Sequence, residues 1–225
     1  MKVAARSLLA LFLLAPLLWA AEPWKGRPYT EWTSKDVQKV LGDSPWTRRV
    51  SFRRTLSSGE QRRATSGVFL PGRTISSETR AQWFVVVQWE SSLTVRQALV
   101  RQRQLRGKYS KGESAPFLSE APTHYVITVF GTGDFFRDVP EETLREAAYL
   151  ELGESKRRIP AVAARYEEER SMLAIVQFHF ARQVGDERAI GPEVKKVKFV
   201  CQMKPDSFSA DFDLRKMVRD GKPDL

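Results

Sequence analysis

Apolar and polar positions follow two different periods along this chain, and together they predict a mixture of helices and strands. Apolar residues recur at helical spacing in three segments, residues 34–41, 93–106 and 140–152. Alternating or continuous apolar runs predict strands over residues 47–54, 83–89, 124–130, 157–166, 172–181 and 194–203. We therefore expect an α+β fold: a mostly antiparallel sheet with two main helices packed on one face, plus a short N-terminal helix.

Signals at the ends of these segments support the helix assignments. Thr33 and Asp36 match the capping-box pattern at the start of the first helix. Ser91 or Ser92 is placed to cap the second helix, and Gly107 follows its last turn. The strand at residues 83–89 (WFVVVQW) is apolar on both faces, which predicts a central strand covered on both sides.

Changes in composition divide the chain into four parts. We expect a signal peptide over residues 1–21, an N-terminal helix and strand module over 22–55, a long polar loop over 56–80 and an α+β body over 81–225. The loop is rich in Ser, Thr, Gly and Arg and shows little periodicity.

The first 21 residues have the three parts of a secretory signal peptide. Lys2 and Arg6 form a basic start, residues 7–19 carry no charge, and the small residues Ala20 and Ala21 follow. The uncharged run is shorter than the roughly 20 apolar residues that a spanning helix needs. We expect cleavage after Ala20 or Ala21 rather than a retained anchor, and hence a periplasmic or extracellular protein that does not span the membrane.

The charge of the chain narrows the range of partners. There are 37 Lys and Arg against 27 Asp and Glu, a net charge of +10, and removing Lys2 and Arg6 lowers it by two to +8. The basic residues are dispersed and are not interleaved with aromatic ones, so no nucleic-acid partner is expected. An exported basic protein is exposed to anionic components of the cell envelope. We therefore expect the partner to be either an unknown protein or an anionic envelope component.

No residue pattern predicts catalysis, a metal or a cofactor. The single cysteine, Cys201, shares an apolar strand face with Phe199 and Met203, which is typical of a core residue. The only histidines are His124 and His179, and no HExxH motif or Cys/His cluster accompanies them. His179 alternates with phenylalanines, which places it on the wetter face of its strand.

Two groups of residues are candidate binding sites. Trp24, Trp32 and Trp46 flank the first helix, where they form a contact patch for a partner or glycan, or else fix that helix to the body. The outer face of the second helix carries a group of basic residues that is a candidate anion-binding surface: Arg96, Arg101, Arg103 and Arg106.

Two segments resemble parts of known proteins. Residues 29–33 (YTEWT), with Asp36-Val37 and residues 40–46 (VLGDSPW), form the first, and residues 212–218 (FDLRKMV) with 220–225 (DGKPDL) form the second. Together with the signal peptide they resemble a group of uncharacterised exported proteins of Acidobacteria-type soil bacteria. The second segment also resembles the tail of some GWxTD-domain proteins, although the Gly-Trp-x-Thr-Asp motif itself is absent. The resemblance implies an exported bacterial protein and no catalytic residue.

These observations predict an exported, non-enzymatic binding or envelope-associated module. A secreted hydrolase without a recognisable motif is one alternative, because catalytic residues often lie far apart in sequence. A basic-surface binder of anionic envelope polymers, using the arginine face of the second helix, is the other.

Overall fold

The computed structural model describes residues 22–55, 80–108, 115–132, 136, 139–169, 173–203 and 206–225. The predicted signal peptide and, apart from residue 80, the predicted polar loop lie outside the described residues. The described chain contains one large antiparallel sheet of eight strands in the order β1-β2-β3-β6-β5-β4-β9-β10.

The bounds of the elements are as follows. The large sheet comprises β1 (Thr47–Thr55), β2 (Arg80–Trp89), β3 (His124–Thr132), β4 (Ala148–Leu152), β5 (Arg157–Glu169), β6 (Leu173–Ala181), β9 (Lys196–Met203) and β10 (Asp206–Asp213). Two small hairpins are β7 (Gln183–Val184) with β8 (Glu187–Arg188), and β11 (Val218–Arg219) with β12 (Lys222–Pro223). The helices are the 3₁₀ turn η1 (Tyr29–Glu31), α1 (Ser34–Gly42), α3 (Leu93–Leu105), α4 (Ala115–Ser119) and α6 (Glu141–Ala147).

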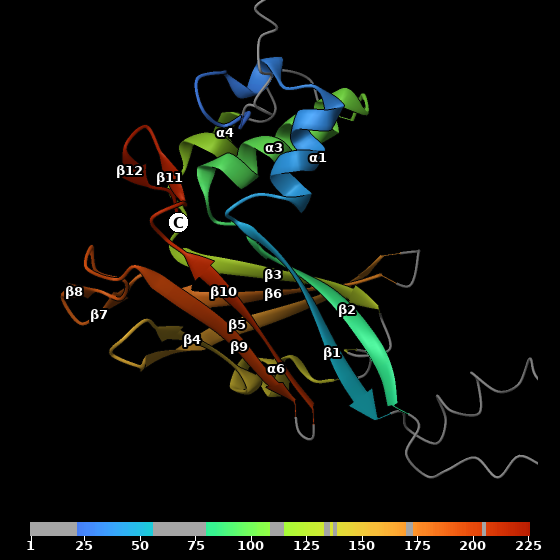
Figure 1. Cartoon of the computed structure of the whole chain (residues 1–225), viewed down its shortest axis with the longest axis vertical. Coiled ribbons are helices and arrows are strands. Elements are labelled where there is room, and N and C mark those ends of the chain that lie inside the picture. The colour runs from blue at the N-terminus through green and yellow to red at the C-terminus, as the bar shows by residue number, and fades with distance from the viewer. Residues whose placement is uncertain are drawn as a thin grey trace, which may run out of the picture.

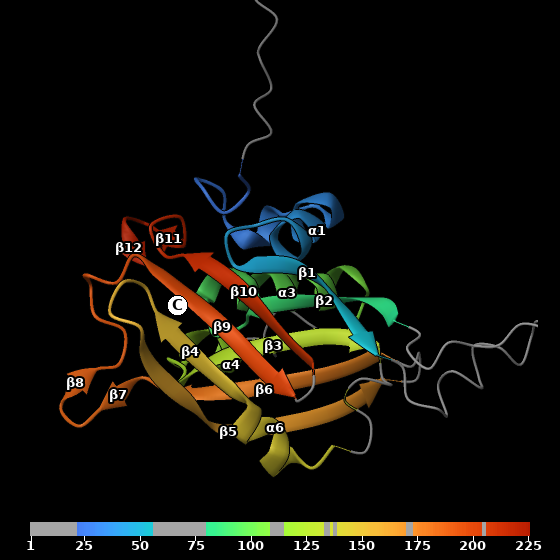
Figure 2. The ribbon, with the colours of Figure 1, turned by 60° about the horizontal axis from the view of Figure 1, so that its bottom comes forward.

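The sheet curls until its two outer strands, β1 and β10, come into contact, which makes it a nearly closed, barrel-like sheet (Figures 1 and 2). All seven neighbouring pairs are antiparallel, so β1 and β10 also run antiparallel. Helices α1, α3 and α4 gather at one end of the sheet, and α6 lies at the opposite end (Figure 1).

In the described residues, β1 and β10 are joined by side-chain contacts and not by a ladder of backbone hydrogen bonds. The Arg48 Nε atom donates a hydrogen bond to the Asp211 carbonyl oxygen at 2.8 Å. The guanidinium of Arg48 also lies 5.4 Å from the ring centroid of Phe212, and the rings of Phe52 and Phe208 stack at 5.2 Å. Burial lowers the pKa of Arg48, although nearby aspartates oppose that shift.

Aromatic side chains fill the interior of the sheet. Phe199 contacts Phe178 at a centroid distance of 5.4 Å and Phe208 at 6.1 Å, and Trp89 meets Phe212 edge-on at 5.3 Å. An eight-stranded closed sheet has an interior just wide enough for side chains to fill. Since these rings are buried and in mutual contact, the interior is a packed core.

The sequence-based fold class is therefore wrong. An α+β fold with two main helices on one face of the sheet does not form, because the sheet buries its inner face against itself. The expected double coverage of β2 also fails along part of the strand. Val85, Val87 and Trp89 point inward, whereas Phe84 on the outer face is 65% exposed and Gln88 is buried beneath α1, donating to the Leu41 carbonyl oxygen.

Two strands of the large sheet were missed in the sequence. The helix predicted over residues 140–152 ends at Ala147, and the chain continues as β4, whose residues are alternately buried and half-buried. β4 pairs with both β5 and β9, so long-range hydrogen bonding replaces the second half of the helix. The strand β10 shows a clear period of two, with Phe208, Ala210 and Phe212 inward.

The helix ends follow the predicted signals. Thr33 and Asp36 form a complete capping box at the start of α1, and Ser92 caps α3 by accepting from the Val95 amide at 3.1 Å. Gly107 follows α3 at a positive φ of 68°, a conformation that glycine adopts without strain. The capping predictions are confirmed.

The C-terminal segment fastens the helical end to the sheet through Asp224. Its carboxylate accepts hydrogen bonds from the backbone amides of Leu93 at 2.6 Å and Thr94 at 3.0 Å, in the first turn of α3. Its carbonyl oxygen accepts from the Trp46 indole nitrogen at 2.7 Å. Residues 22–55 and 80–225 thus share one sheet and one hydrophobic core.

We predict that Asp224→Asn lowers the free energy of unfolding by about 1–3 kcal/mol, because it leaves a buried helix amide without an acceptor. Urea unfolding followed by circular dichroism measures the change. Asp220→Asn is the matched control, since Asp220 is an exposed aspartate at positive φ, which asparagine tolerates, and its substitution is expected to be nearly neutral. Equal effects of the two substitutions would contradict the assigned role of Asp224.

Candidate functional site

A polar pocket of about 340 Å³ lies on the outer face of β3 and β6, beside α3 and α4. Its walls carry the acidic residues Glu90 and Glu120, the polar residues Ser91, Thr123, Gln177 and His179, the cation Arg96 and the apolar residues Phe117, Ala121, Pro122 and Val126. A pocket with apolar walls and a few buried polar groups is typical of a small-molecule site.

The register of three strands places the floor of this pocket. The backbone amide of Glu90, just after β2, donates to the Val126 carbonyl oxygen at 2.9 Å. Val126 on β3 lies opposite His179 on β6. Because neighbouring strands are about 4.8 Å apart, the backbones of Glu90 and His179 lie about 10 Å apart across the width of β3, and their side chains share one face of the sheet.

Neutral donors hold the carboxylate of Glu90. It accepts a hydrogen bond from the Thr128 hydroxyl and, at 3.2 and 3.3 Å, from the amide nitrogen of Gln177. A carboxylate has about four lone-pair sites, so these two donors leave acceptor capacity unused. Glu90 has no ion-pair partner within the described part of the chain.

The imidazole of His179 forms the other side of the pocket floor. Its Nε2 atom is buried and finds no hydrogen-bond partner among the described residues. Burial lowers the pKa of His179, and the nearby charges of Arg165 and His124 lower it further. The two imidazole rings meet edge-on at a centroid distance of 5.9 Å, and His124 Nδ1 lies 2.9 Å from the Thr123 hydroxyl.

Arg96 joins α3 to the segment around α4. One terminal nitrogen donates to the carbonyl oxygens of Phe117 at 2.7 Å and Glu120 at 2.9 Å, and the guanidinium lies 5.9 Å from the Phe117 ring centroid. The Nε atom of Arg96 and the hydroxyl of Ser91 are buried without a partner in the described structure. Arg96 thus positions the pocket wall and leaves one donor free.

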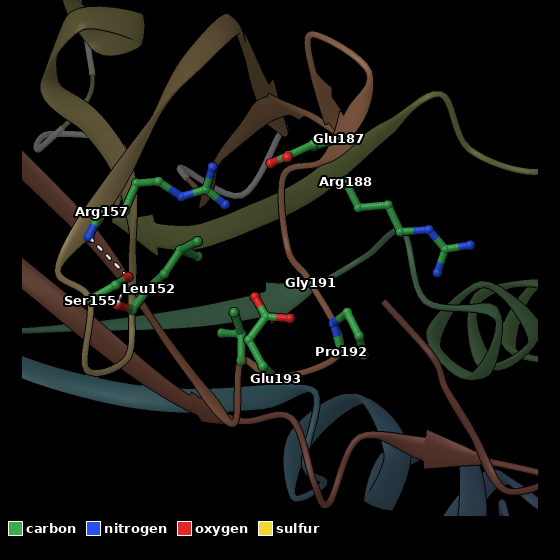
Figure 3. A pocket seen from close by; sticks show the side chains of 9 residues that line it. Leu152, Ser155, Arg157, Glu187, Arg188, Gly191, Pro192 and Glu193 are labelled. Carbon is green, nitrogen blue, oxygen red and sulfur yellow. Dashed lines mark hydrogen bonds between the residues drawn. The ribbon is translucent and has the colours of Figure 1, made fainter.

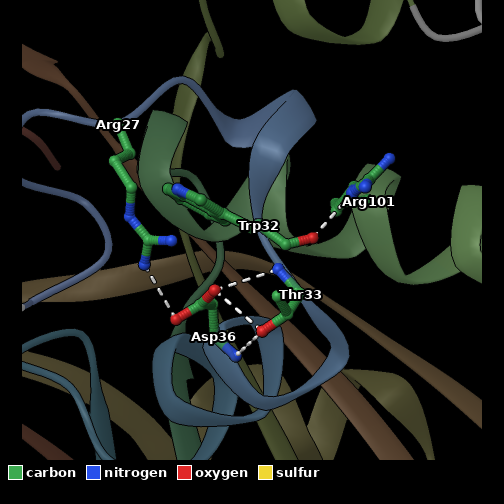
Figure 4. Close-up of polar contacts among 5 residues, drawn as sticks. All are labelled: Arg27, Trp32, Thr33, Asp36 and Arg101. Carbon is green, nitrogen blue, oxygen red and sulfur yellow. Dashed lines mark hydrogen bonds and ion pairs between the residues drawn. The ribbon is translucent and has the colours of Figure 1, made fainter.

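The four arginines of the predicted anion-binding face of α3 lie in different environments. Arg96 is only 9% exposed, and Arg101 donates to the Trp32 carbonyl oxygen at 2.9 Å (Figure 4). Arg103 and Arg106 are exposed near the end of the helix. Since two of the four side chains are engaged by backbone carbonyl groups, the four do not form one free anion-binding surface.

The three tryptophans around α1 are buried in the hydrophobic core. Trp32 and Trp46 are fully buried and Trp24 is 7% exposed, with the Trp24 and Trp46 rings edge-on at 5.5 Å. This placement supports the alternative in which they fix the first helix to the body, and it offers no exposed aromatic patch. Figure 4 shows the adjoining contacts, in which Asp36 accepts from Thr33 and Arg27.

A second pocket of about 490 Å³ lies beside the β4–β5 turn (Figure 3). Arg157 donates to the Ala189 carbonyl oxygen at 2.6 Å, and Arg188 points away from the other side chains. The Glu193 carboxylate lies against Gly191, where a Cβ atom would come within 2.3 Å of it. None of its wall residues carries a buried, unpartnered side-chain atom, so it is the weaker candidate.

The described residues offer no assembled catalytic centre. Cys201 is buried, as predicted, and burial raises its pKa to about 12, so the reactive thiolate is strongly disfavoured. Within the described ranges, no three His, Cys, Asp or Glu side chains are grouped to hold a metal ion, and no helix is long and apolar enough to cross a membrane.

In comparisons with protein-family models, curated proteins and solved structures, no match to this chain was found. The resemblance to exported soil-bacterial proteins therefore stays a prediction.

The sequence analysis missed the pocket. It placed His179 correctly on the less buried strand face but assigned nothing to Glu90, Ser91 or Gln177. Glu90 and Gln177 are 87 positions apart and meet only through the strand register. The period-two position of Gln177 and His179 on an otherwise apolar strand was the available signal.

The lowered pKa of His179 predicts a pH dependence of stability. A histidine whose pKa is lower in the folded than in the unfolded protein stabilises the fold above the unfolded value, near 6.5, and this contribution is lost as the pH falls through the folded value. The free energy of unfolding should therefore decrease between about pH 7 and pH 5.5, and it should decrease less in His179→Gln. Urea unfolding curves across this range measure both slopes. Identical slopes would contradict the prediction.

Proposed function

We propose that this protein is an exported, non-enzymatic binding domain that holds a small polar ligand in the pocket beside α4. The observation that carries the proposal is a set of buried polar atoms that line one concave surface and have no partner among the described residues, namely Ser91 Oγ, Arg96 Nε and His179 Nε2. A buried polar atom costs free energy unless it is hydrogen-bonded, and a bound ligand supplies the missing bonds.

The arrangement favours binding over catalysis. Glu90 is fixed by two neutral donors, Thr128 and Gln177, and within the described residues its carboxylate has no hydrogen bond to a histidine or a cysteine. A general base and a nucleophile need to lie within hydrogen-bond reach of each other or of one reacting atom. The secreted-hydrolase alternative gains no support from this geometry.

The signal-peptide pattern supports export, and it leads to a direct prediction. Expressed in a Gram-negative host, the full chain should be recovered outside the cytoplasm with a mature N-terminus at Ala21 or Glu22. Leu13→Arg should abolish processing, because it places a charge in the apolar core of the signal. Cell fractionation with N-terminal sequencing tests this, and an unprocessed cytoplasmic wild-type chain would contradict export.

We predict that ligands of the wild-type protein shift the imidazole ring signals of His124 and His179, the only histidines in the chain. Compounds first selected by thermal shift from a mixed set of small polar molecules are titrated and followed by NMR. Val126→Phe should weaken their binding at least about tenfold, since the larger side chain occupies the pocket floor.

Ile175→Phe is the matched control, because Ile175 is a half-buried β-branched residue on the outer face of β6 and lies outside the pocket. It should leave the affinity unchanged. Hits that shift neither histidine, or that bind Val126→Phe as tightly as the wild type, would overturn the proposed site.

A further inference from the structure

The charge of the pocket is opposite to that of the chain. Glu90 and Glu120 contribute two negative charges and Arg96 one positive charge, so the ionised wall residues sum to −1, whereas the whole chain carries +10. His179 lines the pocket, the ring of His124 meets that of His179 edge-on from outside the lining, and the exposed Arg165 on β5 lies near His179. The residues that line the pocket are therefore net acidic on a basic protein, whereas Arg165 lies outside the lining.

The carboxylate of Glu90 is the feature that remains unexplained by the fold. The chain has 37 Lys and Arg, yet within the described residues none of them pairs with this half-buried carboxylate. Arg96, the cation that lines the same pocket, directs one terminal nitrogen to two backbone carbonyls instead. Thr128 and Gln177 orient the carboxylate without neutralising its charge.

We infer that the pocket takes an organic cation, an ammonium or guanidinium group on a short apolar stem, with Glu90 as its counterion. This inference rests on the proposed binding function. The free acceptor capacity of Glu90 and the unpartnered hydroxyl of Ser91, the next residue, supply oxygen atoms for the N–H donors of the cation.

The apolar part of such a ligand has a matching wall. Phe117 is 44% exposed at the rim, and Val126 forms the floor between Glu90 and His179. An aromatic face attracts a cation as well as an apolar stem. The ammonium or guanidinium group comes either from a free amine or from a lysine or arginine side chain of a partner protein, and the chemistry at Glu90 is the same for both.

The test uses n-butylammonium and n-butyrate, which share a stem and differ in the sign of the charge. NMR titration of the mature protein follows the ring signals of the two histidines. The ammonium should bind saturably with a dissociation constant on the order of millimolar. It should also lower the pKa of His179 further, because a nearby positive charge disfavours the imidazolium form.

Glu90→Gln should weaken butylammonium binding at least about tenfold, because it removes the counterion while keeping an acceptor for Thr128 and Gln177. Glu193→Gln, in the second pocket, is the control for net charge and should leave the affinity unchanged. An unfolding curve for each variant verifies that it folds. Unchanged butylammonium affinity in folded Glu90→Gln would overturn the assignment of Glu90.

A third probe, Nα-acetyl-lysine methylamide, separates the two sources of the cation. Binding at least about tenfold tighter than butylammonium supports a partner's side chain, and equal or weaker binding supports a free amine.

The outcomes also separate this inference from the proposed function. If butyrate or only neutral compounds bind at the histidines, the pocket is a ligand site and the cation inference is wrong. If no compound in the mixed set and neither butyl probe binds there, both proposals fall.

Discussion

The arrangement of the helical end depends on the hydrogen bonds of Asp224. Its carboxylate caps the first turn of α3, and its backbone carbonyl holds the indole of Trp46 at the start of β1. The carboxylate provides an N-terminal cap from outside the helix, in addition to the local cap from Ser92. One residue near the C-terminal end of this chain thus joins α3 and β1, two elements distant from it in sequence.

The hydrogen bonds of Asp224 also affect the pocket, because they fix the helix that carries Arg96. With the N-terminus of α3 fixed, Arg96 lies in the first turn of the helix and reaches the carbonyl groups of Phe117 and Glu120. Those carbonyls belong to the segment of α4, which walls the pocket above β3 and β6. Burial of Arg96 is compensated by these hydrogen bonds, as a buried charge requires. The position of the pocket wall therefore depends on how the N-terminus of α3 is held.

Local features could be predicted from the sequence, and the closure of the sheet could not. The Thr33–Asp36 capping box and the burial of Cys201 depend on residues a few positions apart, and both predictions are confirmed. Closure depends on β1 meeting β10, through contacts such as that between Arg48 and Asp211, 163 positions apart. The alternation of apolar and polar residues along one strand does not show which distant strand it will contact. The two segments used for the family resemblance also meet, since Trp46 and Asp224 belong to one each.

Glu90 could not be singled out from the sequence for the same reason, because its partners are distant in sequence. In sequence it is one acidic residue between a strand and a helix, and its neutral partners come from β3 and β6. Glu90 has no ion pair among the described residues, although an opposite charge would favour its ionised form. Residues that break such local rules are expected at functional sites. Thr128 and Gln177 hold the charge in place without neutralising it, and the proposed cation site rests on this arrangement.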